Sequence, residues 1–314
     1  MKKVLVTLSI LALSHSAFAL EQMNDQDLAS QTGQDGITIK LGVSAVSFDQ
    51  LSLIDTDGIA ATTSTGSAAL AIAPITSTGS VKVNFLNAGG TSVNNLFTAT
   101  IDSDGGATPS GAFANINMAF SELKQVTIDP FAIYLAPTLN INRKIGSTGS
   151  VFTGTALRSG VSKLLQIGDA SNKLSINFKD PMSANIQLGN APQGHLVQLS
   201  GSLQSINIPK IKIFSKNTVA SEDNSLSLDA AITATNSATG IRLDGFYMDV
   251  APDGLNFGKT GTTDKFDLTL NNVVVGKLGA TDAGSFNGLK NGSMGNFGVI
   301  GASVTNLKVN VKGM

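Results

Sequence analysis

Two pairs of aspartates are spaced so that they could bind a cation. Asp55 and Asp57 lie in "IDTDG", and Asp102 and Asp104 lie in "IDSDG" further along the chain. Carboxylates two residues apart in a turn can both face Ca²⁺, and the glycine permits the sharp bend. Neither loop has the Glu that completes an EF-hand. The alternative is a turn in which Asp oxygens accept hydrogen bonds from nearby backbone N–H groups. We favour the turn, predict no required cofactor, and keep the four aspartates as candidate calcium ligands.

The chain is poor in two of the residue types that commonly serve as catalytic nucleophiles, bases or metal ligands. Histidine occurs only at positions 15 and 195, and there is no cysteine. A Ser-His-Asp triad would have to use His195, in "PQGHLVQL", because His15 lies in a predicted leader. No G-x-S-x-G elbow is present, and a zinc site lacks its usual ligands. A carboxylate pair for glycoside hydrolysis stays open. We predict that the protein is not an enzyme and that His195 lies at a strand edge.

The stretch "DGLNFGKTG", residues 253–261, resembles a phosphate-binding loop. The glycines at 254 and 258 enclose three residues, where the phosphate loop has four. The following "TGTTDKFDLTL" indicates a loop and a strand, so no helix N-terminus would point at a phosphate. We predict a hairpin turn here.

The first nineteen residues are typical of a Sec-type signal peptide. Lys2 and Lys3 precede the apolar run "VLVTLSILAL", and Ala17-Phe18-Ala19 forms an A-x-A cleavage site. Cleavage would leave residues 20–314, with 21 − 2 = 19 basic and 22 acidic residues, a net charge of −3. This balance argues against nucleic-acid binding. We predict no transmembrane segment after cleavage, and a location in the periplasm, on the outer membrane surface or outside the cell.

From Gly36 onward the apolar residues recur with period two, which is typical of strands. The alternating segments include "GITIKLGV", "SVKVNFLN", "KLSINFK", "SLQSINIPKIKIF", "KFDLTLNNVVVGKLG" and "VTNLKVNVKG". The faces opposite the apolar stripe carry small polar residues, which favours antiparallel pairing. We predict an all-β fold with a large antiparallel sheet and little helix, arranged as an elongated β-sandwich or in a solenoid-like way. The best helix candidate is residues 155–167, "TALRSGVSKLLQI".

The domain prediction has three parts: a signal peptide at 1–19, an acidic segment at 20–35 and a β-rich body at 36–314. The body could be subdivided near 145–170. The two Asp loops suggest a strand–loop–strand unit used twice, because each is entered and left by an apolar strand. Coincidence in a Gly/Ser/Thr-rich chain is the alternative.

The segment "LEQMNDQDLASQTGQDGITI" resembles the start of the Fil-type pilus system protein family of gammaproteobacteria. The matching positions are Asp27, Leu28, Thr32, Gly33, Gln34, Gly36, Ile37 and Ile39. The resemblance covers about twenty residues and implies a location better than an activity.

We therefore expect a non-enzymatic, exported protein of the cell envelope or cell surface that is a component of a pilus or adhesion system. Its expected partners are other envelope or pilus proteins or further copies of itself. The alternative is a periplasmic or outer-membrane-associated protein that binds a lipid or another apolar ligand on an amphipathic sheet.

Overall fold

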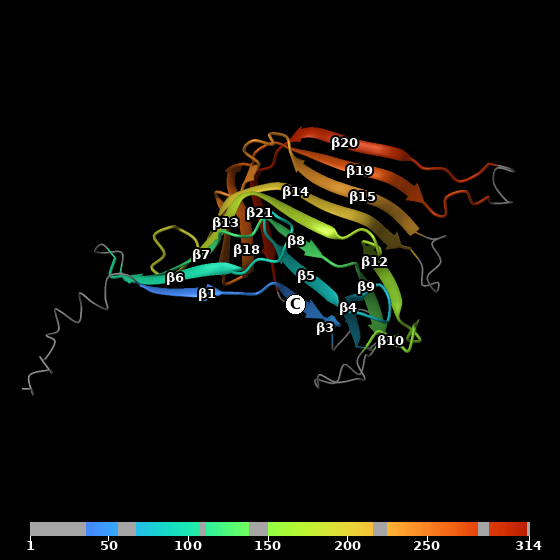
Figure 1. Ribbon diagram of the computed structural model, residues 1–314, viewed down its shortest axis with the longest axis horizontal. Coiled ribbons are helices and arrows are strands. Elements are labelled where there is room, and N and C mark those ends of the chain that lie inside the picture. Colours follow the sequence, from blue (N-terminus) through green and yellow to red (C-terminus); the bar gives the residue numbers. More distant parts are fainter. Residues whose placement is uncertain are drawn as a thin grey trace, which may run out of the picture.

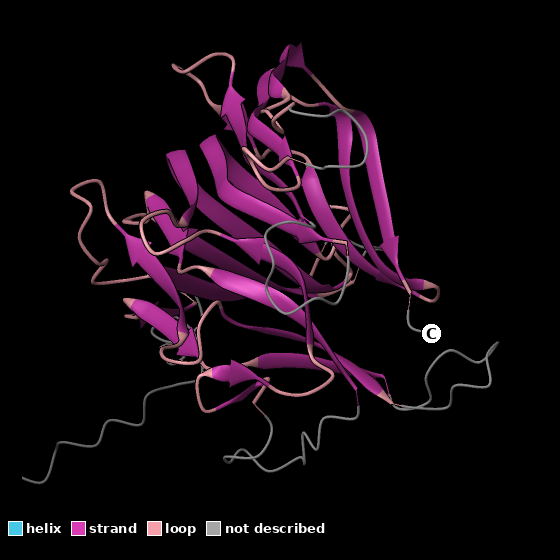
Figure 2. Cartoon of the chain, turned by 90° about the vertical axis from the view of Figure 1, so that its right-hand side faces the viewer, coloured by secondary structure: helices cyan, strands magenta, loops and turns pink. Residues whose placement is uncertain are grey.

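The computed structural model describes residues 36–55, 67–106, 111–137, 150–215, 225–281 and 289–312. These residues form strands and loops and no helix (Figure 2). Nineteen strands belong to one large antiparallel sheet, and two more form a separate hairpin. The predicted all-β, antiparallel fold is confirmed. The predicted signal peptide and acidic segment lie outside the described residues.

The nineteen strands join end to end into eight long runs. In chain order the runs are as follows: run 1, β1 (Ile37–Leu41), β2 (Ala45–Phe48) and β3 (Leu51–Asp55); run 2, β4 (Ala68–Pro74), β5 (Val81–Leu86) and β6 (Phe97–Asp104); run 3, β7 (Phe113–Phe120), β8 (Gln125–Ile128) and β9 (Phe131–Pro137); run 4, β12 (Ser162–Ile167) and β13 (Leu174–Gly189); run 5, β14 (Val197–Phe214); run 6, β15 (Ser225–Ala234), β16 (Ile241–Arg242) and β17 (Phe246–Ala251); run 7, β18 (Gly254–Thr262) and β19 (Phe266–Val275); run 8, β20 (Gly295–Ala302) and β21 (Thr305–Val311).

Each run pairs with the runs before and after it in the chain, so the sheet is a meander. Run 3, for example, pairs with run 2 through β4–β9, β5–β8 and β6–β7, and with run 4 through β9–β12, β8–β13 and β7–β13. Figure 1 shows β14, β15, β19 and β20 side by side at one border of the sheet, and β1 beside β6 at another. The paired strands leave runs 1 and 8 as the two edges.

One face of the sheet is apolar from edge to edge. A single register row crosses all eight runs through Ile37, Ile101, Ile116, Ile186, Val197, Met248, Phe257 and Val309. A second row crosses runs 2 to 8 through Phe85, Val126, Ile176, Ile206, Ile232, Leu268 and Val299. Because directly paired residues point to the same side of a sheet, these rows define one surface, called the apolar face below.

The opposite face, called the polar face below, carries amides and hydroxyls. The row next to the first one runs through Thr38, Thr100, Asn117, Asn185, Gln198, Tyr247, Gly258 and Lys308. Side chains on this face bond across strands: the Gln125 amide donates to Asn177 Oδ1 (2.8 Å), and the Asn177 amide donates to Ser205 Oγ (2.9 Å). These cross-strand bonds add to the backbone ladder without needing a second layer.

A small close-packed core lies where a hairpin covers part of the polar face. The hairpin consists of β10 (Phe152–Thr153) and β11 (Ala156–Leu157). Its neighbours Val151 and Val161 pack against Tyr134 and a set of buried alanines of β4 and β9: Ala71, Ala73, Ala132 and Ala136. Alanines there leave room for the hairpin to approach the sheet. The buried Tyr134 hydroxyl donates to the Pro74 carbonyl (2.9 Å).

The predicted helix at 155–167 is wrong. Ala156–Leu157 is β11 and Ser162–Ile167 is β12, which pairs with β9 and β14. Gly160 between them has φ 80°, and a Cβ there would meet Pro137 Cγ at 2.9 Å. The left-handed glycine interrupts any helix, so Leu157 reaches the small core from β11 and Val161 from the loop before β12. The predicted subdivision near 145–170 is not tested, although the sheet continues through β12.

Other predictions agree with the described strands. The two Asp loops do join strand pairs, β3–β4 and β6–β7. The stretch 253–261 begins at the turn of the β17–β18 hairpin, where Ala251 pairs with Gly254, as predicted. Pro209 does not end its strand. The register of β14 against β15 shifts between Ile208 and Ile211, so a bulge contains the proline and Lys210, which has φ 52°.

Carboxylates occupy the places where the runs bend and backbone N–H groups lose their strand partners. Glu122 accepts from the N–H groups of Asn94 (2.9 Å) and Asn95 (3.3 Å). Three other bends use Asp229 for Lys210 N–H (2.8 Å), Asp264 for Arg242 N–H (2.8 Å) and Asp267 for Gly301 N–H (2.9 Å). Each carboxylate supplies an acceptor that the neighbouring strand cannot.

Tyr134→Phe should destabilise the protein by about 1–2 kcal/mol, because it leaves the Pro74 carbonyl without its hydroxyl donor in a buried site. Urea unfolding followed by circular dichroism measures the change. Tyr247→Phe is the matched control, since the Tyr247 ring stacks on His195 at the surface. Equal stability of the two variants would contradict the role given to the Tyr134 hydroxyl.

Acid should unfold the protein through the bend carboxylates. The Asn95 amide, followed by the N–H groups of Asn94 and Asn95, holds the pKa of Glu122 below its usual value. Arg242 does the same for the pKa of Asp264, and the Gly301 N–H group for that of Asp267. Because these pKa values are lower in the folded state, their stabilisation is present above the unfolded values, near pH 4, and is lost as pH falls through the folded values.

The urea midpoint should therefore change little between pH 7 and pH 5 and fall progressively below about pH 4. Glu122→Gln should lower the midpoint at pH 7 and make the fall on acidification shallower. A Glu122→Gln curve that runs parallel to that of the parent protein at every pH would contradict this assignment.

Candidate functional site

The three candidate calcium ligands that the structure describes, Asp55, Asp102 and Asp104, lie in two separate places. Asp55 ends β3 in run 1, whereas Asp102 and Asp104 end β6 in run 2. Asp55 pairs with Ala68 at the start of run 2, whereas Asp102 and Asp104 lie at the end of run 2, beyond the pair of Ile101 with Ile37. Asp57 lies outside the described residues. Asp55 is therefore separated from Asp102 and Asp104 by the length of a run.

The second Asp loop makes the contacts of a capped turn. Asp104 Oδ1 accepts from the Gly106 N–H group (2.7 Å), and Asp102 Oδ1 accepts from the Ser103 N–H group (2.8 Å). Both aspartates are exposed. In the described ranges no three His, Cys, Asp or Glu side chains gather as a metal site would require. Calcium binding by either loop stays a prediction.

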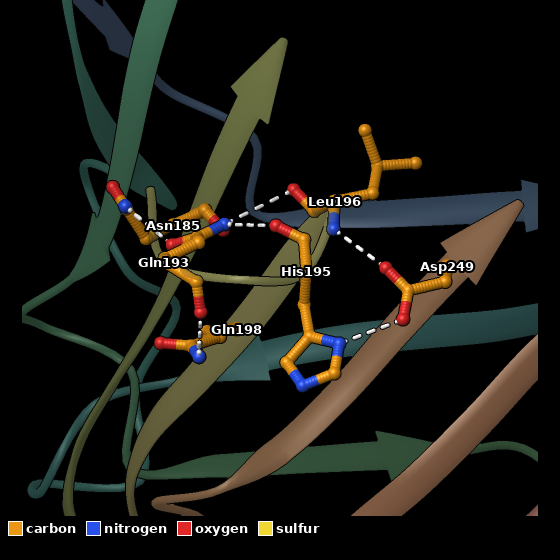
Figure 3. A network of polar contacts seen from close by, with 6 residues as sticks. All are labelled: Asn185, Gln193, His195, Leu196, Gln198 and Asp249. Carbon is orange, nitrogen blue, oxygen red and sulfur yellow. Dashed lines mark hydrogen bonds and ion pairs between the residues drawn. The ribbon is translucent and has the colours of Figure 1, made fainter. Parts of the chain in front are cut away.

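His195 lies in a polar network at the turn between runs 4 and 5 (Figure 3). Its Nδ1 is 2.7 Å from Asp249 Oδ2, and the other carboxylate oxygen accepts from the Leu196 N–H group (2.8 Å). The imidazole stacks on the Tyr247 ring, with centroids 3.9 Å apart and planes 9° from parallel. Both partners come from β17. His195 itself lies in the turn two residues before β14 begins, not within a strand.

Gln193 closes the same turn from its other side. Its side-chain amide donates to the carbonyls of His195 (2.7 Å) and Leu196 (3.3 Å), and it accepts from the Asn185 amide (2.9 Å). An open cavity of about 250 Å³ adjoins this turn. The network therefore has the acceptors and donors to hold residues 190–196 against β13 and β17.

The network lacks the parts of a hydrolytic site. Asp249 orients the imidazole as the acid of a catalytic triad would, but among the described side chains no hydroxyl bonds to His195. The other oxygen of Asp249 accepts a hydrogen bond from the Leu196 backbone N–H group. The arrangement fits a structural clasp between runs 5 and 6. Sequence inspection missed Asp249 and Tyr247 because nothing in the chain order places them beside His195, 54 residues away for Asp249.

The apolar face is the most extensive feature that needs a functional explanation. Most of the large apolar side chains that solvent reaches lie on it, among them Ile37 (63% exposed), Leu53 (74%) and Val250 (72%). Strands are about 4.8 Å apart, so eight runs span roughly 35 Å. Monomeric soluble proteins rarely expose apolar patches of more than a few hundred Å². In the described part of the chain, the hairpin β10–β11 covers the sheet on the polar side, not on this one.

In the comparisons with known proteins, one family model matches the N-terminal part of the chain. The model of a family of unknown function, DUF6160, matches residues 1–121. The matched part covers runs 1 and 2 and ends just after β7 in run 3. No curated protein and no solved structure matches the chain. The resemblance to Fil-type pilus proteins therefore stays a prediction.

No helix among the residues that the structure describes is long and apolar enough to cross a membrane.

Asp249→Ala should cost about 1–3 kcal/mol of stability, because it removes the acceptor for both the Leu196 N–H group and His195. His195→Ala should cost less, since the Leu196 contact to Asp249 remains. Thermal and urea unfolding of both variants show which substitution causes the larger loss of stability. A larger loss for His195→Ala would contradict the clasp.

Proposed function

We propose that this protein is a non-enzymatic, exported component of the cell envelope, within a pilus or adhesion system, and that it works by assembly through its apolar face. The observation that carries the proposal is the unbroken apolar surface across all eight runs, with no second layer over it in the described residues. An amphipathic sheet needs another element against its apolar side.

The make-up of the two faces supports assembly rather than catalysis. The polar face satisfies its amides and hydroxyls across strands, as in the 2.6 Å contact between Ser183 and Ser200. The apolar face is mainly aliphatic, so it can contribute buried area to an interface but no side-chain hydrogen bonds. Interfaces that persist bury such surfaces, with roughly 800 Å² per partner in a standard case. The N-terminal resemblance and the predicted leader support export.

The second candidate is a binding protein for a lipid or another apolar ligand. The continuity of the apolar rows favours it, because acyl chains are held by aliphatic side chains without directional bonds. Both candidates use the same face, so they differ in what covers it: another protein in the first, small apolar molecules in the second.

Location tests the first candidate. A C-terminal tag on the protein in its host should be cleaved by protease added to intact cells. Mechanical shearing should release the protein in fibres or surface material. Protection from protease until the outer membrane is broken would contradict the surface role and favour the ligand-binding candidate.

Variants of the apolar face test the mechanism. Leu53 and Leu70 pair across β3 and β4 and are 74% and 43% exposed, so a Leu53→Gln/Leu70→Gln variant should fold normally. It should lose the association of the protein with sheared surface material, because two apolar contacts become polar. Thr38→Gln, on the exposed polar face of β1, is the matched control. Normal surface association of the double variant would contradict assembly through this face.

The purified protein separates the two candidates. The mass spectrum of an organic extract should show no stoichiometric lipid if a protein covers the face. One or more equivalents of lipid, lost in the Leu53→Gln/Leu70→Gln variant, would favour the second candidate instead.

A further inference from the structure

We propose that β20 is a self-association edge, where two copies of this chain pair antiparallel about a two-fold axis near Gly298. The proposal concerns the edge of the sheet, and it holds whichever partner covers the apolar face.

Strand β20 has one partner in the sheet. It pairs with β19 through contacts from Phe266–Ala302 to Val273–Gly295, and no described strand pairs with its other side. Its side chains are correspondingly open: Phe297 is 51% exposed, Val299 53% and Ile300 85%. A strand in this position presents a row of backbone N–H and C=O groups to any strand that arrives.

The sequence around β20 lacks the charges and prolines that protect most edges, and the one bulge of β20 lies at its C-terminal end, between Val299 and Ala302. Residues 291–307, "NGSMGNFGVIGASVTNL", contain no charged residue and no proline. Natural edge strands are usually blunted by charges, especially lysine, by proline, by bulges or by being short. β20 is eight residues long. It is therefore chemically suited to pairing.

The other edge of the sheet shows the protection that β20 lacks. Run 1 is divided into strands of five, four and five residues. Lys40 lies within β1, and Asp49 lies in the break between β2 and β3. Run 8 is also divided, and its second strand, β21, carries Lys308. The contrast therefore makes β20 the open part of the two edges.

A two-fold axis at Gly298 gives a compatible register. Antiparallel pairing then places Phe297 opposite Val299 of the second copy, on the apolar side, and Gly298 opposite its own counterpart on the polar side. Asn296 lies opposite Ile300 of the second copy. No like charges meet, and apolar cross-strand pairs add to the stability of the ladder. Because the axis is perpendicular to the sheet, both apolar faces lie on the same side of the joined sheet.

The pattern favours a second copy over a different protein as the occupant. The edge carries no charge that a complementary partner could recognise. The β20 strand of a second copy can pair with it in the register given above. Main-chain hydrogen bonds supply the affinity in strand addition, and alternate side chains supply the match. Here the alternate side chains of β20 provide that match themselves.

Gly298 allows a test that leaves the monomer intact. A Cβ at this position would come no closer than 3.7 Å to the Leu268 carbonyl oxygen, and the position lies on the polar face opposite Thr269. Gly298→Lys and Gly298→Glu should therefore both fold, with unchanged urea midpoints. Across the two-fold axis each variant places like charges opposite each other, which should weaken dimerisation about fivefold.

Sedimentation velocity of the purified exported chain over a concentration series gives the dimer dissociation constant. The expected result has three parts: a dimer for the parent protein, weaker dimers for each variant alone, and restored dimerisation when the two variants are mixed. The weakening should shrink at high salt, where charges are screened. Thr38→Lys, which adds the same charge to the other edge, should leave the dissociation constant unchanged.

A parent protein that stays monomeric at all concentrations would overturn the proposal. So would dimers that neither Gly298 variant weakens, or dimers that Thr38→Lys weakens instead. Dimers lost only in the Leu53→Gln/Leu70→Gln variant would assign the contact to the apolar face, which separates failure of this inference from failure of the proposed function.

Discussion

Backbone hydrogen bonding between successive runs is the interaction on which this structure depends. The chain has no cysteine, and among the described residues the cluster around Tyr134 under the β10–β11 hairpin is a small core. A sheet of long strands keeps its ladder only if every bend offers substitute acceptors. Glu122, Asp229, Asp264 and Asp267 do so for N–H groups of neighbouring runs. These four carboxylates therefore have a structural role.

The bends also have to preserve the two faces. One extra residue in a strand exchanges its sides, so an uncompensated bulge would place leucines in water and asparagines against any partner. In β14 the bulge at Pro209 and Lys210 keeps Ile208 and Ile211 on the same side, because they pair with Ala230 and Leu228 of one β15 face. Asn272, with φ 54°, acts similarly in β19. Left-handed residues at these positions let a bent sheet remain amphipathic from edge to edge.

The sequence predicts the local elements better than their continuity. Alternation located β1, β5, β13, β14, β19 and β21, because a half-buried strand imposes period two. The helix predicted at 155–167 failed because Leu157, Val161, Leu164 and Leu165 have helical spacing for another reason: the first two enter the small core and the last two lie in a bulged strand. The collinear runs could not be predicted, because pairing such as Ile37 with Ile101 depends on contacts far apart in sequence. The clasp of His195 and Asp249 was missed for the same reason.

The structure leaves two needs unmet within the described residues, and both concern association. The apolar face lacks a second layer, and β20 lacks a partner on its outer side. The two surfaces are perpendicular, since one lies above the sheet and the other in its plane. Pairing through β20 would widen the apolar face without covering it. A dimer formed in this way offers a partner the apolar faces of two copies, because edge contact and face contact do not compete for the same atoms. Such a division of roles suits an envelope component that assembles first and makes its surface contacts as an assembly.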